Sequence, residues 1–357
     1  MNNDTSLLWR RLRDADIVAG DCPEKQQDSS PWYIRVMLGI TGWLAALFLL
    51  GFVAVGLQFI IENKALATIF GALVMVVAFA LFRKGSNEFI EQFGLVLSLT
   101  GQALFLFGII DAIGWHGPAP WFIGAGLQVI VIFLMANFLQ RLLAGYFFIV
   151  ALSAALSYYG GVSLALAFAA LLAVLFWLNE FRWGSLGILL RPAAYGVTIS
   201  LLQIKGQTVL DEVADLFLRS HGENTFVLPG RLDEVVLGFL LVAVSARIMH
   251  RYGTGWTDGR MQLVILLAAA VAAVSFEAPG ISVGLTLILL GFGSFNRIVL
   301  GLGIASLLLY ISAYYYSLET TLLHKSATLA ATGGILLLVR LAVSKWLFTG
   351  VKEVGHE

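Results

Sequence analysis

Residues 65–82 read ALATIFGALVMVVAFALF, and the basic pair Arg83 and Lys84 follows directly. The run contains no charged residue, and a helix of this length matches the hydrocarbon thickness of a bilayer. Strands of a membrane barrel are about ten residues long and alternate in polarity, whereas this run is continuously apolar. The stretch therefore predicts a transmembrane α-helix.

Apolar runs of about 18 to 22 residues, separated by short polar segments, continue along the chain. Of the 357 residues, 59% are hydrophobic and 12% are Asp, Glu, Lys or Arg, and the mean hydropathy is +0.88. We expect an all-α, polytopic transmembrane helix bundle of about 12 spans, with 11 or 13 as alternatives. The predicted spans are 34–61, 65–82, 89–110, 121–139, 142–158, 160–179, 185–203, 233–249, 261–276, 281–295, 298–316 and 327–348.

The predicted spans define the domain organisation. Residues 1–33 form a cytoplasmic helix and linker, and residues 349–357 form a cytoplasmic tail. Residues 34–348 form the transmembrane domain, whose first half is 34–179 and whose second half is 185–348.

The longest predicted outer loop, residues 204–232, contains an amphipathic helix. This helix either packs on the bundle or serves as a lid or a site for a partner protein. Its apolar face consists of Val209, Val213, Leu216 and Phe217.

The basic residues predict the orientation. With both termini in the cytoplasm, sixteen of the 22 Lys and Arg residues lie on the inner side, as expected because cytoplasmic loops retain positive charge. Deleting one span would invert every later loop, so the partition also supports the span count. No cleaved signal peptide is indicated, and the span starting near Ile34 is expected to direct insertion. On the outer side lie Lys64, Lys205, Arg219, Arg231 and Lys325, and Arg191 lies within a span.

The two halves share a pattern that predicts a parallel six-plus-six repeat. Such a duplication would place a pseudo-two-fold axis along the membrane normal. Apolar helices also resemble each other by chance, so both interpretations stand. The matching positions are Arg141, Gly145, Tyr158 and Tyr159 in the first half and Arg297, Gly301, Tyr314 and Tyr315 in the second.

Polar residues inside the predicted spans are candidates for substrate binding, because such groups are costly in lipid. Arg191, next to Pro192, and Arg340 either contact an anion in a cavity or reach the headgroups by snorkelling. Gln102 and Gln128 lie near the middles of their spans, where an amide can bond a neighbouring helix or a polar substrate.

Two acidic residues end predicted spans on the outer side. Asp111 and Glu277 are candidates for an access site for protons or cations. The alternative is that they have no function, since an acid at the wet end of a span needs none.

Several functional classes are disfavoured. All five histidines fall in predicted loops or the tail, and Cys22 is the single cysteine, so no metal site and no catalytic group at membrane depth is predicted. No phosphate-binding loop or dinucleotide fingerprint is present. The 22 basic and 22 acidic residues balance, which disfavours nucleic acid as a partner. We expect no enzyme activity and no cofactor.

Residues 8–12 read LWRRL, residues 30–35 read SPWYIR and residues 42–51 read GWLAALFLLG. With these stretches the chain resembles a bacterial, multi-pass inner-membrane family that carries a domain of unknown function, over most of its length. The resemblance implies a location in the bacterial inner membrane but no activity and no catalytic residue. It also implies a membrane partner, because members are encoded beside another membrane protein with a Gly-Asp-Tyr-x-x-Leu-x-x-Pro motif.

Two functional hypotheses remain. A transporter or permease for a small solute is favoured by the many spans, the short loops and the two halves, which suit alternating access. A non-transporting subunit or scaffold, acting with a partner in the bilayer, is favoured by the scarcity of acids predicted at mid-depth, since proton-coupled carriers usually need one.

Overall fold

The computed structural model describes residues 3–15, 63–84, 88–114, 117–218, 232–276 and 279–317, with single residues at 37, 40, 41, 44, 45, 48, 51 and 326. Every regular element within these residues is helical. The elements are α1 (Asn3–Asp14), α4 (Lys64–Lys84), α5 (Glu88–Ile113), α6 (Ala119–Leu134), α7 (Phe138–Ser157), α8 (Val162–Asn179), the short 3-10 helix η1 (Glu180–Arg182), α9 (Ser185–Leu218), α10 (Leu232–Arg251), α11 (Gly259–Val274), α12 (Ile281–Gly293) and α13 (Arg297–Ser317).

Helices α4 to α13 overlap the predicted spans between residues 65 and 316, although several of their bounds differ. The predicted span 327–348 and most of 34–61 lie outside the described residues. Six helical segments of the described chain are long and apolar enough to cross a bilayer, while α6, α11 and α12 are apolar but shorter. The chain is therefore an integral membrane protein. The six segments are Lys64–Lys84, Phe89–Ile113, Phe138–Ser157, Val162–Arg182, Ser185–Val209 and Arg297–Tyr315.

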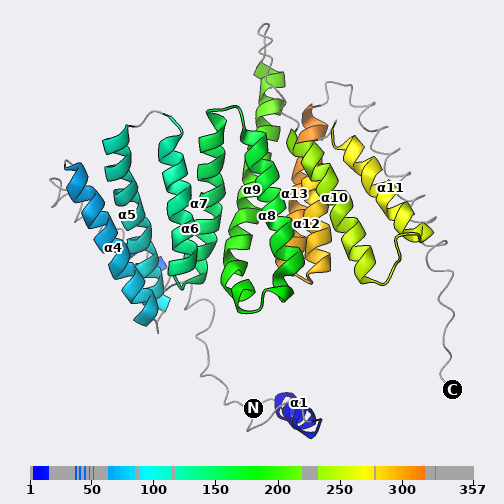
Figure 1. The fold of residues 1–357 in the computed structure, drawn as a ribbon, viewed down its shortest axis with the longest axis horizontal. Helices are drawn as coiled ribbons and strands as arrows, with labels where there is room; N and C mark the ends of the chain where they lie inside the picture. Colours follow the sequence, from blue (N-terminus) through cyan, green and yellow to red (C-terminus); the bar gives the residue numbers. More distant parts are fainter. Residues whose placement is uncertain are drawn as a thin grey trace.

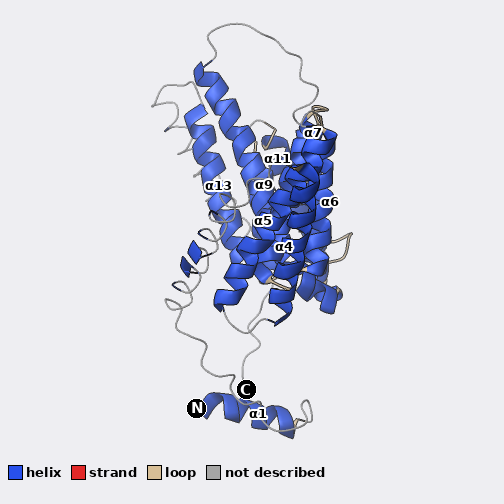
Figure 2. Ribbon diagram, turned by 90° about the vertical axis from the view of Figure 1, so that its left-hand side faces the viewer, coloured by secondary structure: helices blue, strands red, loops and turns tan. Residues whose placement is uncertain are grey.

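Helices α4 to α13 stand side by side and alternate in direction along the chain, while α1 is drawn apart from them (Figure 1). Short connections such as residues 85–87 and 158–161 favour antiparallel neighbours. Figure 2 shows the same bundle from the side, with α9 beside α13.

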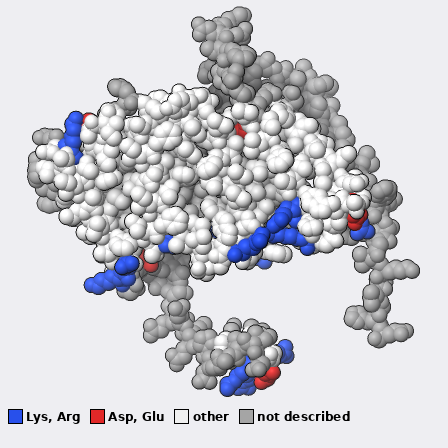
Figure 3. All heavy atoms as spheres, viewed as in Figure 1, with Lys and Arg blue, Asp and Glu red and all other residues white. Residues whose placement is uncertain are grey.

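Basic side chains gather at one end of the bundle, along the lower edge in Figure 3, and the middle of that face is almost free of charge. This asymmetry is the one expected of a membrane protein with a cytoplasmic basic end. The span count, the repeat and the sidedness of the termini stay predictions. By the helix bounds, the first or last turn of a helix contains Arg83, Lys84, Arg141, Arg182, Arg251, Arg260 and Arg297.

Glycines bring neighbouring helices close together. A Cβ added at Gly71 of α4 would overlap the backbone of α5 at Phe105, and one at Gly196 of α9 would overlap the backbone of α7 at Leu142. Without a hydrophobic driving force in lipid, such close backbone contact is a main source of helix association. Close packing thus explains the glycines at these two helix contacts.

Helix α9 differs from its prediction at its outer end. It begins at residue 185 as expected, but it does not end at 203 and continues to Leu218, with Pro192 inside it. The start of the predicted outer loop, residues 204–218, is therefore helical. Lys205, which we assigned to that loop, lies within α9 and is only 3% exposed. The longer helix therefore contains a buried charged residue, Lys205, where the sequence predicted an exposed loop.

Candidate functional site

Gln102 of α5 and Gln128 of α6 are in direct contact. Gln128 Nε2 donates to Gln102 Oε1 at 2.9 Å, and Gln102 Nε2 donates to Ser98 Oγ at 3.1 Å. Both amides are buried. The chain of donors runs in one direction, and Gln128 Oε1 has no hydrogen-bond partner among the described residues. A buried acceptor without a donor is costly, so this oxygen can accept a donor from a bound molecule.

A cavity of about 490 Å³ opens beside this amide pair. Its volume lies within the usual range for small-molecule sites, about 300 to 1,000 Å³. The wall combines the two glutamine side chains with mostly apolar residues from α5, α6 and α7, and none of the described residues that line it carries a formal charge. The lining residues are Leu99, Gln102, Ala103, Leu106, Ile110, Pro120, Trp121, Gly124, Gln128, Phe147, Val150, Ala151 and Tyr158.

The cavity extends from the amides toward the less basic end of the bundle. Ile110 ends the α5 wall there, and Trp121 and Tyr158 stand beside a second, more open hollow of about 310 Å³. Asp111 follows Ile110 directly, and its Oδ2 lies 2.8 Å from Lys64 Nζ. The predicted access residue Asp111 is thus adjacent in sequence to the cavity wall, in a partly exposed ion pair.

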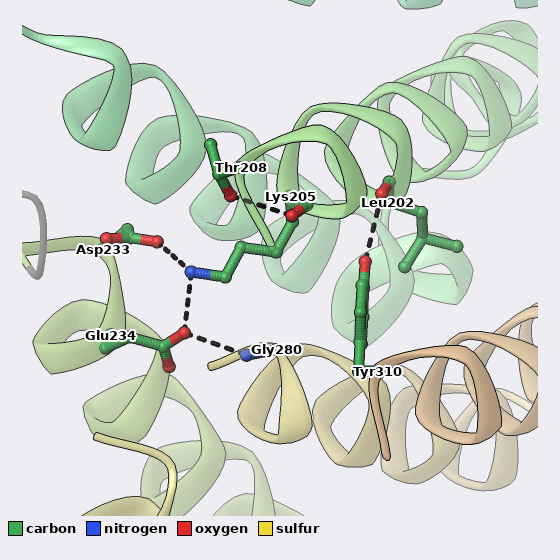
Figure 4. A network of polar contacts seen from close by, with 7 residues as sticks. All are labelled: Leu202, Lys205, Thr208, Asp233, Glu234, Gly280 and Tyr310. Atoms are coloured by element: carbon green, nitrogen blue, oxygen red, sulfur yellow. Dashed lines mark hydrogen bonds and ion pairs between the residues drawn. The ribbon is translucent and has the colours of Figure 1, made fainter. Parts of the chain in front are cut away.

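A second polar centre lies where α9, α10, α12 and α13 meet. Lys205 Nζ lies 2.5 Å from Asp233 Oδ2 and 2.7 Å from Glu234 Oε1. We call these three residues the ion triad. Figure 4 shows the ammonium between the two carboxylates, and the side chains are at most 4% exposed. Charges so deeply buried are rare unless they are paired, and in a membrane protein they mark functional candidates.

Backbone and aromatic groups surround the ion triad. Glu234 Oε1 also accepts the N–H of Gly280 at 3.0 Å, immediately before α12. The hydroxyl of Tyr310 in α13 donates to the Leu202 carbonyl of α9 at 3.0 Å, across from the triad in Figure 4. The second oxygen of each carboxylate, Asp233 Oδ1 and Glu234 Oε2, is buried with no hydrogen-bond partner in the described part of the chain.

Arg191, one of the two predicted arginine sites, lies at neither centre. Arg191 Nε lies 3.0 Å from Glu180 Oε1, and its side chain is 50% exposed. The hollow beside it measures about 10 Å³, which is too small for a solute. Arg340 and Glu277 lie outside the described residues. Their proposed roles stay predictions.

Sequence reasoning missed the ion triad because it ended the span before Lys205. One signal was available: Leu201, Lys205 and Val209 are four residues apart, so a helix places them on one face. Leu201 and Val209 are both buried. A lysine on such an apolar stripe needs an acidic partner, and Asp233 and Glu234 begin the next predicted span.

A comparison with protein families gives one match. Residues 31–346 match the family described as "Domain of unknown function (DUF4401)". The chain belongs to this family. No curated protein and no solved structure matches the chain. The DUF4401 match confirms the resemblance to a domain of unknown function, and it begins at the SPWYIR stretch, whereas the LWRRL leader lies outside the matched residues.

Proposed function

We propose that this DUF4401 protein is a membrane carrier for a small, uncharged solute, which binds in the cavity beside Gln102 and Gln128. The observation that carries the proposal is the free acceptor, Gln128 Oε1, buried at the wall of a cavity of about 490 Å³. A cavity between membrane helices with a few placed polar groups is the usual form of a small-molecule site.

The cavity lining favours one class of solute. The described residues that line the cavity carry no formal charge, so an ion would lose its hydration without compensation from them. The apolar wall favours an apolar or aromatic body. The unfilled amide oxygen favours a molecule with one hydrogen-bond donor, such as an N–H or a hydroxyl group. Indole, which has one N–H and no strong acceptor, is a suitable probe, and N-methylindole is the same shape without the donor.

Gly124 allows a direct test of the cavity. It lines the cavity, and a Cβ there would meet only Ala151 Cβ, at 3.9 Å. Gly124→Leu should therefore fill the cavity without displacing backbone. Gly126, on the same helix, is exposed and has no neighbouring atom of the described residues within 4 Å of its Cβ position, so Gly126→Leu is the matched control.

The experiment measures indole binding to the full-length protein in lipid nanodiscs, by the shift in thermal unfolding midpoint, and then indole flux in proteoliposomes. We expect indole to stabilise the wild type and Gly126→Leu but not Gly124→Leu, and N-methylindole to bind at least tenfold more weakly. Binding that survives in Gly124→Leu, or equal binding of the two probes, would contradict the proposed site. Binding without flux would contradict the carrier function.

A second candidate is a non-transporting subunit that acts with a partner membrane protein. It is favoured by Arg191 and Asp111, which are both engaged in ion pairs at the bundle ends and do not line the cavity. Co-purification of a membrane protein that is retained by Gly124→Leu, in the absence of indole flux, would support it. For either function we propose the bacterial inner membrane as the location, with the basic end in the cytoplasm, from the family resemblance and the charge asymmetry.

A further inference from the structure

We propose that the ion triad is a proton-binding site, in which one of the two carboxyls takes up and releases a proton while Lys205 remains charged. The proton comes from water and returns to it, so no other reactant is needed. The site is separate from the Gln102–Gln128 cavity, and its test does not depend on the proposed solute. If both exist, the proton is the natural coupling ion for the carrier.

The charge count is the first argument. With both carboxylates ionised, the triad carries a formal charge of minus one, because Lys205 balances only one of them. A net charge is costly in a site this deeply buried. The N-termini of α10 and α12, where Glu234 and Gly280 lie, offset part of that charge but supply no mobile cation. One proton makes the triad neutral.

The free carboxylate oxygens are the second argument. Lys205 and Gly280 occupy Asp233 Oδ2 and Glu234 Oε1, whereas Asp233 Oδ1 and Glu234 Oε2 are buried without a partner among the described residues. An ionised carboxylate normally has donors on both oxygens. A proton on one free oxygen removes its need for a donor and keeps the existing bonds to Lys205 in place.

Polar groups continue from the triad into the interface between α10 and α12. Gly293 faces α10, because a Cβ there would lie 3.1 Å from Ile248 Cδ1. Helical spacing places Thr286 and Ser282, seven and eleven residues earlier, on that same face. Both hydroxyls are buried without a hydrogen-bond partner in the described chain. A hydroxyl both donates and accepts, so this stripe offers partners for a protonated carboxyl or for water.

The elements packed around the triad supply few other titratable groups. Tyr310 comes from α13, and Tyr146 of α7 bonds Gln203, two residues before Lys205. Helix α8 contains no charged or titratable side chain, and the charged residues of α11 and the lower half of α10 lie at the opposite end. The side chains of residues 210–231 and Glu277 lie outside the described set. The carboxyls of Asp233 and Glu234 are therefore the acids to test.

The test is infrared difference spectroscopy of the full-length protein in lipid nanodiscs, recorded against pH in H₂O and D₂O. We expect a C=O band of a protonated, buried carboxyl that appears and disappears reversibly with pH and shifts in D₂O. At least one of the two substitutions, Asp233→Asn or Glu234→Gln, should abolish this band. It should remain in Asp111→Asn, the control, because Asp111 is partly exposed and paired with Lys64.

The result does not depend on the variants alone. If both substitutions prevent folding, wild-type protein labelled with ¹³C separately at Asp and at Glu carboxyls assigns the band to one residue type. The proposal would be overturned if the wild type showed no reversible band of a protonated carboxyl. It would also be overturned if the only such band disappeared in Asp111→Asn. A band unchanged in both triad variants would overturn it as well. Indole binding without this band would leave the carrier proposal standing, and the band without indole binding would leave the proton site standing.

Discussion

Lys205 of α9 and Asp233 of α10 form an ion pair, with 2.5 Å between Nζ and Oδ2, although 27 residues separate them in the chain. Removing the lysine would leave two carboxylates buried without their cation. We expect Lys205→Met to lower the free energy of unfolding by about 3 to 5 kcal/mol. The thermal unfolding midpoint in detergent measures the loss.

Lys64→Met is the control for that substitution. Lys64 also pairs with an acid, Asp111, but its side chain is 56% exposed. An exposed pair contributes about 0 to 1 kcal/mol, so this variant should unfold close to the wild type. Equal midpoints for Lys205→Met and Lys64→Met would contradict the burial of the triad.

Gly196 tests how α7 and α9 are held together. A Cβ at this position would overlap the Leu142 carbonyl, so Gly196→Ala must push the two helices apart. We expect a clear loss of stability, by about 1 to 3 kcal/mol as for other overpacked sites. Gly206, on the same helix, has no atom of the described residues within 4 Å of its Cβ position, so Gly206→Ala should be neutral or stabilising, because alanine favours the helix. The ratio of folded to aggregated protein in size-exclusion chromatography after heating distinguishes them.

The positions of the helices were largely predictable from sequence. Long apolar runs such as 65–82 and 142–158 coincide with α4 and α7, because only a helix satisfies its own backbone hydrogen bonds in lipid. Gln102 and Gln128 were recognised as amides at mid-span, and the structure places them in contact. Their shared cavity was not predictable, since it depends on how α5, α6 and α7 pack.

The end of α9 and the ion triad were not predicted. Gln203, Lys205 and Gln207 interrupt the apolar run, so average polarity indicated a loop after residue 203. In the structure Lys205 is stabilised by acids of the following helix, a long-range pairing that no local window contains. Tertiary contacts here override local polarity.

Arg191 can be tested for its predicted role as an anion contact in a cavity. It pairs with Glu180, is half exposed and does not line the cavity. We therefore expect Arg191→Ala to leave indole affinity unchanged, and to alter stability by no more than about 1 kcal/mol.

Gln128→Met, which removes the free amide oxygen, should weaken indole binding by about tenfold. This factor corresponds to a hydrogen bond of about 1.4 kcal/mol. Isothermal titration measures the indole affinity of both variants. A loss of affinity in Arg191→Ala would show that the arginine contributes to indole binding.

Gly280 links backbone conformation to the ion triad. It has φ of +94°, a region that favours glycine, and its N–H donates to Glu234 Oε1. A Cβ here would also lie 2.7 Å from Cγ of Tyr310, so Gly280→Ala combines backbone strain with a clash against α13. Gly253 also has a positive φ, +82°, but no described residue lies within 4 Å of its Cβ position. Gly253→Ala should therefore cost only the strain, about 1 kcal/mol. We expect Gly280→Ala to lower the unfolding midpoint further than Gly253→Ala and to alter the infrared band of the triad carboxyl, which Gly253→Ala should leave in place. Equal effects of the two alanines on the midpoint would show that the ring of Tyr310 yields, and that only the backbone conformation at Gly280 matters.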